Sequence, residues 1–403
     1  MIKKTRLIIL FVCVSCFLVS TPVLVAYSIG YRFDFEKMRI ASTGGIYVRT
    51  YPGPEQVIID SKIIEKPGIF SNATFTQSLL PDEHTILAQK AGYYDYFKTV
   101  LVQEKEVTKL ENIILFKKNI QFELVDAKIS SPFDDKEKFV LKNNSLYYSN
   151  VLENIGISAT QKAIPVIKNV AAFCDYNDPS LITWLGTDGI LYQSNISNPI
   201  EEKETKISIM PVEIGKKDTY KLVCAEEKMF LIINNELFRY AGDIRAFEDY
   251  HLQANNIKAS LNGTNIIYYY NNNIYYYDDL VRISQLQSSP EPALLYKSSE
   301  KISDYLWLNN YYIAFTAGDK IIISETDYRG NINTVTLPQT VTVTKIPASV
   351  AQKSDTTTQV TNVSEPQEIE ITIKNPQIYF NQRENKLYIL TGDNLLVSEK
   401  IIP

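Results

Sequence analysis

Two cysteines outside the apolar N-terminal segment, Cys174 and Cys224, could form a disulfide. They lie 50 positions apart, and each precedes a similar strand-turn-strand pattern. If these patterns are adjacent repeats of one fold, equivalent strands approach each other closely enough for a disulfide in an oxidising compartment. Two buried free thiols are the alternative.

A second candidate is a group of tyrosines around the turn at 271–273. Tyr268, Tyr270, Tyr275 and Tyr277 flank this turn, and tyrosine is abundant in the chain, at 27 copies. Exposed rings at such a place could stack on a glycan or a partner protein. Packing between repeats is the alternative interpretation.

The residue types that most catalytic sites need are scarce. His84 and His251 are the only histidines among 403 residues, and the chain has four cysteines. The sequence contains no phosphate-binding Gly loop, no His-Glu-x-x-His and no Gly-x-Ser-x-Gly. We therefore expect no enzyme activity, no metal site and no cofactor. A net charge of -5 also argues against a nucleic-acid surface built on phosphate neutralisation.

The first element that could position these residues is an uncharged apolar stretch at 7–29. A helix of this length can cross a bilayer core of about 30 Å. Lys3, Lys4 and Arg6 precede it, so the positive-inside rule keeps the stub 1–6 in the cytoplasm and exports the rest. We predict a single-pass cell-membrane protein with its bulk outside the cytoplasm.

A signal peptide cleaved after Ala26 is the alternative. Leu24 occupies the position two residues earlier, where the peptidase prefers a small side chain. The apolar run is also longer than the roughly 7–15 residues of a secretory core. Both features favour an uncleaved anchor.

Short strand patterns separated by turn residues follow at 42–118. They predict five strands, at 45–49, 56–60, 85–88, 99–102 and 112–116. Around 97–102, side chains alternate with a period of two, which gives one face better buried. Five strands in this length predict a small β-sandwich.

This region resembles the PEGA domain, a small exported module of bacterial envelope proteins. The resemblance is best kept at Leu79-Leu80-Pro81 and at Gly92-Tyr93. It is weaker in the first turn, where Pro54 and Glu55 stand in place of Gly and Ala, and Ser61 and Asp82 replace two further glycines. The resemblance implies a β-sandwich, an envelope location and a binding or structural role, and it implies no catalytic residue. The segments that carry it are Thr43-Gly44-Gly45-Ile46, Pro52, Val57-Ile58-Ile59-Asp60, Leu79-Leu80-Pro81-Asp82 and Lys90-Ala91-Gly92-Tyr93.

From 119 to 403 one pattern recurs six times: an apolar strand, an Asn/Asp/Gly turn, and a second apolar strand. The residue after the turn falls at 146, 191, 237, 274, 321 and 387. The last interval contains a Ser/Thr/Gln-rich stretch at 348–367, which we interpret as a flexible insertion. Repeats of roughly 40–45 residues with such hairpins are typical of four-stranded β-propeller blades. Six hairpins predict six blades, and seven is the alternative because 119–125 could add a strand to either end.

Together these features predict an all-β protein with an N-terminal transmembrane helix. The expected function is a non-enzymatic, membrane-anchored platform that binds an envelope protein or a cell-wall glycan. The alternative is an exported polysaccharide hydrolase or lyase with acids in the propeller channel. That alternative requires carboxylates that converge at one mouth of the channel.

Overall fold

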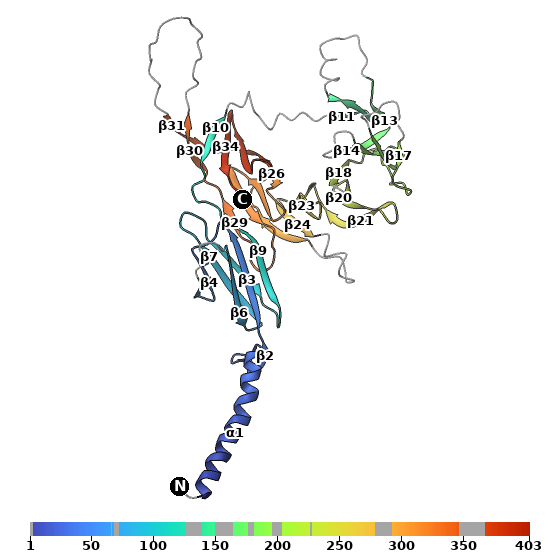
Figure 1. Cartoon of the computed structure of the whole chain (residues 1–403). Coiled ribbons are helices and arrows are strands. Elements are labelled where there is room, and N and C mark those ends of the chain that lie inside the picture. The colour runs from blue at the N-terminus through green and yellow to red at the C-terminus, as the bar shows by residue number, and fades with distance from the viewer. Residues whose placement is uncertain are drawn as a thin grey trace, which may run out of the picture. The chain divides into compact units, whose positions relative to one another are not determined.

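The computed structural model describes residues 3–65, 67, 72–125, 139–149, 164–175, 181–195, 204–225, 228–278, 292–345 and 367–403. Within them it has one long helix, α1 (Lys3–Ser28), followed by β-strands, which confirms the mostly β class. The chain divides into two compact units (Figure 1). Unit 1 is Met1–Ile120 with Asp327–Val335 and Lys400–Pro403, and unit 2 is Gln121–Thr326 with Thr336–Glu399.

Helix α1 is apolar on all sides. Its stretch Arg6–Ser28, 23 residues with a mean hydropathy of 2.7, has no buried part. At about 1.5 Å per residue it is long enough to cross a bilayer, and a signal sequence would have the same properties. The helix ends at Ser28, two residues before Gly30, whose φ of 94° suits glycine and whose N–H donates to the Tyr27 carbonyl.

A short antiparallel hairpin follows the helix. Its strands are β1 (Tyr31–Asp34) and β2 (Arg39–Ser42). The carbonyl of Gly30 accepts hydrogen bonds from both the backbone N–H and the side-chain Oγ1 of Thr43, at 2.8 and 2.7 Å. Both ends of the hairpin are therefore held at the end of α1.

The strands within residues 44–114 form two sheets that share one core. Ile46 and Val48 of one sheet pack in the same cluster as Val57, Ile59 and Ile86 of the other. All five predicted strands are present, and β5 and β6 are additional. One sheet has the order β6-β3-β9, with β3 (Gly44–Tyr51), β6 (Ala73–Leu79) and β9 (Val107–Ile114). The other has the order β5-β4-β7-β8, with β4 (Gln56–Ile59), β5 (Lys62–Glu65), β7 (Glu83–Gln89) and β8 (Tyr96–Leu101).

Lys98 lies on the buried side of β8, between Tyr96 and Val100. It is completely buried, and its ammonium donates to the carbonyl of Asp327 and lies 4.0 Å from that residue's carboxylate. Asp327 comes from a distant part of the sequence, so one buried charge joins two separate segments of unit 1.

The segment Asp327–Val335 also covers the free edge of β8. The Asn331 side chain accepts from the Thr99 N–H and donates to the Phe97 carbonyl, both at 2.7 Å. Asn333 accepts from the Phe97 N–H at 3.1 Å. These amides take the place of a neighbouring strand, which explains why this segment groups with unit 1 although it lies within the range 119–403 predicted to be propeller-like.

The remaining strands form six sheets. Five are antiparallel and follow the chain in order, as the strands of propeller blades do. They are β11 (Phe139–Lys142), β12 (Ser145–Tyr148) and β13 (Ile167–Lys168); β14 (Val170–Asp175), β15 (Leu181–Gly186), β16 (Leu191–Asn195) and β17 (Thr205–Lys206); β18 (Tyr220–Ala225), β19 (Lys228–Ile233), β20 (Glu236–Ala241) and β21 (Ala246–Gln253); β22 (Asn256–Ala259), β23 (Asn265–Tyr270), β24 (Asn273–Asp278) and β25 (Ala293–Lys297); and β26 (Ile302–Trp307), β27 (Tyr312–Ala317), β28 (Lys320–Glu325) and β29 (Thr334–Thr336).

The sixth sheet joins the two ends of the propeller-like region. Its order is β31-β30-β10-β34-β33-β32, and β10 pairs antiparallel with β34. The early strand therefore joins the last sheet, and the described part of the propeller-like region contains six sheets. Its strands are β10 (Phe122–Val125), β30 (Thr340–Lys345), β31 (Gln367–Thr372), β32 (Gln377–Asn381), β33 (Lys386–Thr391) and β34 (Asn394–Lys400).

All six predicted hairpins are present, and asparagine turns close three of them. Asn143-Asn144, Asn234-Asn235 and Asn271-Asn272 have positive φ at both central positions, between 49° and 72°. This is the type I′ geometry that matches strand twist, and asparagine tolerates it. The predicted insertion 348–367 lies outside the described residues, except for Gln367 at the start of β31.

Candidate functional site

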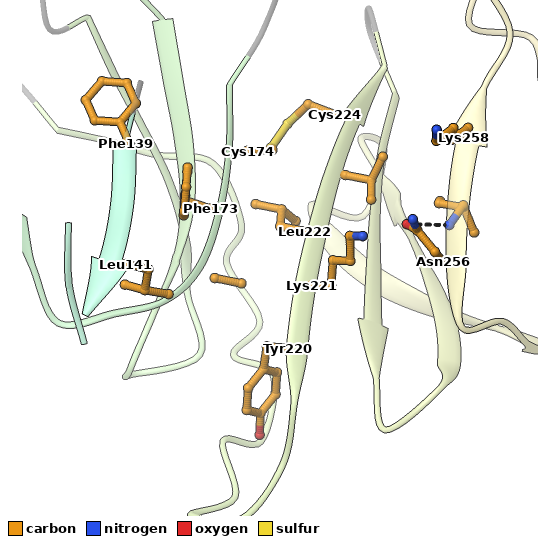
Figure 2. A pocket seen from close by; sticks show the side chains of 13 residues that line it. Phe139, Leu141, Phe173, Cys174, Tyr220, Lys221, Leu222, Cys224, Asn256 and Lys258 are labelled. Carbon is orange, nitrogen blue, oxygen red and sulfur yellow. Dashed lines mark hydrogen bonds between the residues drawn. A yellow bond between two sulfur atoms is a disulfide. The ribbon is translucent and has the colours of Figure 1, made fainter. Parts of the chain in front are cut away.

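One feature of unit 2 with the character of a site is a hollow among the first strands of its sheets (Figure 2). It measures about 510 Å³, and β11, β14, β18 and β22 contribute to it. The lining residues are Phe139, Leu141, Ala172, Phe173, Cys174, Tyr220, Lys221, Leu222, Val223, Cys224, Asn256, Ile257 and Lys258.

A second hollow of about 510 Å³ adjoins the first. The two share Val223, Cys224, Ile257 and Lys258, and the second extends to β26 and β32. An end strand of each of the six sheets thus lines one hollow or the other. This is the arrangement expected of the innermost strands of a propeller. We call the two adjoining hollows together the axial channel.

The channel wall is mainly apolar with a few polar groups. Lys221 and Lys258 are its charged members, and Asn256 and Gln382 add side-chain amides. The Lys258 ammonium lies 3.7 Å from Asp304 and 5.1 Å from the centre of the Tyr305 ring. Lys258 is therefore held by a carboxylate and an aromatic face, whereas Lys221 is exposed.

No aspartate or glutamate is among the described residues that line the two hollows. Glycoside hydrolysis needs two carboxyl groups that converge on one bond. The described lining does not supply the acid pair that the hydrolase alternative requires. In the part of the chain that the structure describes, there is also no group of three His, Cys, Asp or Glu side chains arranged to hold a metal ion.

The structure brings Cys174 and Cys224 together as a disulfide. The two Cα atoms are 5.7 Å apart, within the usual range for such a bond. Cys174 is on β14 and Cys224 is on β18, so the bond joins the first strands of two consecutive sheets beside the channel (Figure 2).

The expectation of an aromatic contact surface on the β23-β24 hairpin needs correction. Tyr268 and Tyr277 are 3% exposed and belong to a core cluster, and Tyr270 and Tyr275 are half-buried against the same cluster. The rings of Tyr268 and Tyr275 are stacked, with centroids 5.2 Å apart. Burial raises the pKa of the Tyr268 hydroxyl, with smaller contributions from Tyr275 and Tyr277. These rings serve packing because alternation turns them toward the neighbouring sheet.

The other face of the same hairpin packs against the next sheet. Tyr269 meets Tyr305 edge to face at 5.6 Å, and Tyr276 meets Trp307 at 6.5 Å. Opposite these, Tyr277 lies 5.1 Å from Tyr250 of the preceding sheet. The tyrosine-rich hairpin therefore fills both inter-sheet spaces, which accounts for much of its composition.

No protein-family model and no curated protein matches the sequence. Among solved structures, the chain is similar to the C-terminal WD40 domain of Sif2, at 12% identity over 56% of each chain with a TM-score of 0.33. It is also similar to Hsv2p of Kluyveromyces lactis, at 11% identity over 68% of this chain and 72% of that one, with a TM-score of 0.37. The β-propeller domain of Cps50 (Swd1) from Myceliophteria thermophila shares 6% identity over 78% of this chain and 92% of that one, with a TM-score of 0.34. The propeller-like assignment itself rests on the strand order and the axial channel.

Proposed function

We propose that this chain is a non-enzymatic, membrane-anchored binding platform that acts outside the cytoplasm. The observation that carries the proposal is the exposed apolar helix α1 joined to β units that contain a disulfide. Disulfides persist in oxidising compartments and are rare in the cytosol. The bond therefore supports export, independently of the charges that precede the helix.

The charges around α1 support the same orientation. Lys3, Lys4 and Arg6 precede the apolar stretch, and Asp34 is the first acidic residue after it. Basic residues stay on the cytoplasmic side of a membrane span. The N-terminus is then cytoplasmic, and both β units lie on the outer side.

We further propose that residues 42–118 are a PEGA-like module. Two packed sheets in this region support the proposal. Gly92, at a φ of 80°, forms a turn that L side chains rarely adopt, directly before Tyr93, which packs against the core. Gly92-Tyr93 is one of the two segments in which the resemblance is best kept.

The channel is the proposed contact site for an envelope protein or a cell-wall glycan. Its apolar wall offers area to bury, and its lysines and amides can orient polar groups of a ligand. Because no described lining residue is acidic, a partner that carries carboxylates fits the wall best. The disulfide holds two of the lining strands together, which limits the cost of ordering the site on binding.

The orientation is tested by protease treatment of intact cells and of permeabilised cells. We expect the β units to be cleaved in both, and an N-terminal tag to be cleaved only after permeabilisation. Protection of the β units in intact cells would contradict the exported orientation, and loss of the tag from the mature chain would indicate a cleaved signal.

Partner binding is tested with the detergent-solubilised full chain against purified cell wall and against envelope proteins. Lys221→Glu places a carboxylate in the channel, whereas Lys216→Glu makes the same change at an exposed position outside the lining. We expect Lys221→Glu to weaken binding several-fold and Lys216→Glu to leave it unchanged. Equal effects of the two variants would contradict a binding site in the channel.

A further inference from the structure

The β1-β2 hairpin exposes its large apolar side chains and buries the carboxylate of Asp34, while Glu36, Lys37 and Arg39 are also exposed. Phe33 and Ile40 are direct cross-strand partners and are 43% and 70% exposed. Phe35 is 79% exposed and packs edge to face on Phe33, with centroids 4.9 Å apart. Met38, at 74%, completes an apolar face that we call the hairpin face: Phe33, Phe35, Met38 and Ile40.

The opposite side of the hairpin is packed within unit 1. Asp34 and Ala41 are 3% and 1% exposed. Asp34 accepts hydrogen bonds from the backbone N–H groups of Glu36 and Lys37, each at 3.0 Å, which fixes the turn. Arg32 donates to the Ser78 hydroxyl on β6 at 3.3 Å. A hairpin facing water normally has the reverse arrangement, with apolar side chains on the packed side.

The turn itself also presents an apolar residue. Met38 adopts a φ of 48°, a conformation in which glycine or asparagine is the usual residue. The chain keeps a large exposed apolar side chain there in spite of the backbone cost. Exposure of Met38 is thus a consequence of a defined turn geometry.

The hairpin face continues the apolar surface of α1. Leu24, Tyr27 and Ile29 at the end of the helix are 66%, 59% and 65% exposed. The Arg32 guanidinium stacks 3.4 Å above the Tyr27 ring, and it donates to the Tyr27 carbonyl. Tyrosine and arginine at the end of an apolar helix are typical of the membrane interface.

We propose that the hairpin face lies in the headgroup region of the outer leaflet, beside the point where α1 leaves the bilayer. This inference rests on the proposed membrane anchor. Apolar side chains at the boundary of headgroups and acyl chains gain free energy from burial, and the lipid is the occupant that continuity with α1 selects. The hairpin then gives unit 1 a second contact with the membrane, beside α1.

The test uses single tryptophan substitutions in the full chain, reconstituted into phosphatidylcholine and phosphatidylglycerol vesicles. Phe35→Trp and Met38→Trp report on the hairpin face. Tyr51→Trp is the matched control, because Tyr51 is half exposed and lies at the other end of β3 from Gly44, roughly 23 Å away at 3.3 Å per residue. Emission of the parent chain, which contains Trp184 and Trp307, is subtracted.

Phospholipids brominated near the carbonyl end of the acyl chain provide the quencher. We expect them to quench the added emission of Phe35→Trp and Met38→Trp several-fold and to leave that of Tyr51→Trp unchanged. Quenching of the hairpin variants no stronger than that of the control overturns the proposal. So does protection from aqueous iodide without quenching by bromolipid, because a protein partner would then cover the face.

Flotation of the same vesicles after an alkaline wash separates this inference from the anchor. A chain that floats but whose Phe35→Trp emission is not quenched overturns the hairpin proposal alone. A chain that does not float overturns the proposal that α1 is a membrane anchor. It also overturns the hairpin proposal, which depends on the anchor. Floating together with selective quenching supports both.

Discussion

At the scale of single residues, the hydroxyl of Tyr305 is buried, and no hydrogen-bond partner for it exists among the described residues. Burial raises the pKa of this hydroxyl, with smaller contributions from Tyr269 and Asp304. The Lys258 ammonium lies over the face of the Tyr305 ring and makes no hydrogen bond to the Tyr305 hydroxyl in the described structure. The oxygen therefore contributes a desolvation cost that no contact in the described structure offsets.

We expect Tyr305→Phe to leave the free energy of unfolding unchanged or to raise it by up to about 1 kcal/mol. Tyr305→Ala removes the ring that packs on Tyr269 and should cost about 3–5 kcal/mol, as for other large aromatic residues. Chemical denaturation of both variants measures this. A clear loss of stability in Tyr305→Phe would show that the hydroxyl has a partner after all.

Asp327 gives unit 1 a stability that depends on pH. Burial alone would raise the pKa of its carboxyl, but hydrogen bonds from Arg329 and the charges of Lys98 and Arg329 hold that pKa below its usual value. Because this pKa is lower in the folded chain than in the unfolded chain, where it is about 3.9, the ionised carboxylate stabilises the fold at pH values above about 3.9. This stabilisation is lost as the pH falls through the folded pKa.

Asp327→Asn should therefore lower the stability of the chain at neutral pH. The difference between the variant and the parent should shrink as the pH falls below about 4 and through the lowered folded pKa, because the parent carboxylate then also becomes neutral. Thermal unfolding across this range is the measurement. A difference that is constant with pH would mean that the carboxylate charge is not responsible.

At the scale of elements, the segment Asp327–Val335 depends on a glycine. Gly330 has a φ of 63°, and a Cβ built there would overlap the Thr99 carbonyl on β8. Gly392 has nearly the same φ, 58°, but open space around the corresponding position. Alanine at either position adds backbone strain, but only alanine at Gly330 would also collide with β8. Comparing the two substitutions therefore separates the two effects.

We expect Gly392→Ala to cost about 1–2 kcal/mol, the penalty of a left-handed residue. Gly330→Ala should cost more and should also release the segment from β8, so that trypsin cleaves at Arg329. Thermal unfolding and limited proteolysis provide the two readouts. Equal costs with no new cleavage would mean that the segment adjusts without leaving β8.

The disulfide is the second device at this scale. It closes a stretch of 50 residues between β14 and β18. Cys174→Ala combined with Cys224→Ala should lower the stability of unit 2 by about 2–4 kcal/mol under oxidising conditions. The parent chain should fall to the same stability when reduced. A parent that is insensitive to reductant would show that the thiols are free.

Local patterns allowed the hairpins to be predicted, and non-local contacts escaped prediction. An Asn-Asn turn such as Asn271-Asn272 determines the geometry of its own hairpin, so three of the six hairpins carried a local turn signal of this kind in the sequence. The burial of Lys98 depends on Asp327, 229 positions later, and no nearby residue indicates it. The tyrosines around the β23-β24 turn were visible too, but their burial depends on Tyr250 of a different sheet.

At the scale of the whole molecule, the candidate site is assembled from residues that share no motif. Lys221 and Lys258 come from β18 and β22, and Gln382 follows β32. Each is an ordinary polar residue in its own repeat. They line two adjoining hollows because each of the six sheets contributes an end strand to one hollow or the other, so the repeat count could predict such a site but not its lining.

The pairing of β10 with β34 sets the order in which the chain can fold. Phe122 lies opposite Ser398, so the sixth sheet cannot be completed until the chain has been synthesised through Ser398. Until then β10 has an open edge while the five intervening sheets form, and strand edges of this kind are prone to pair with other chains. The edge of β10 that pairs with β34 is therefore open to such pairing until β34 is present.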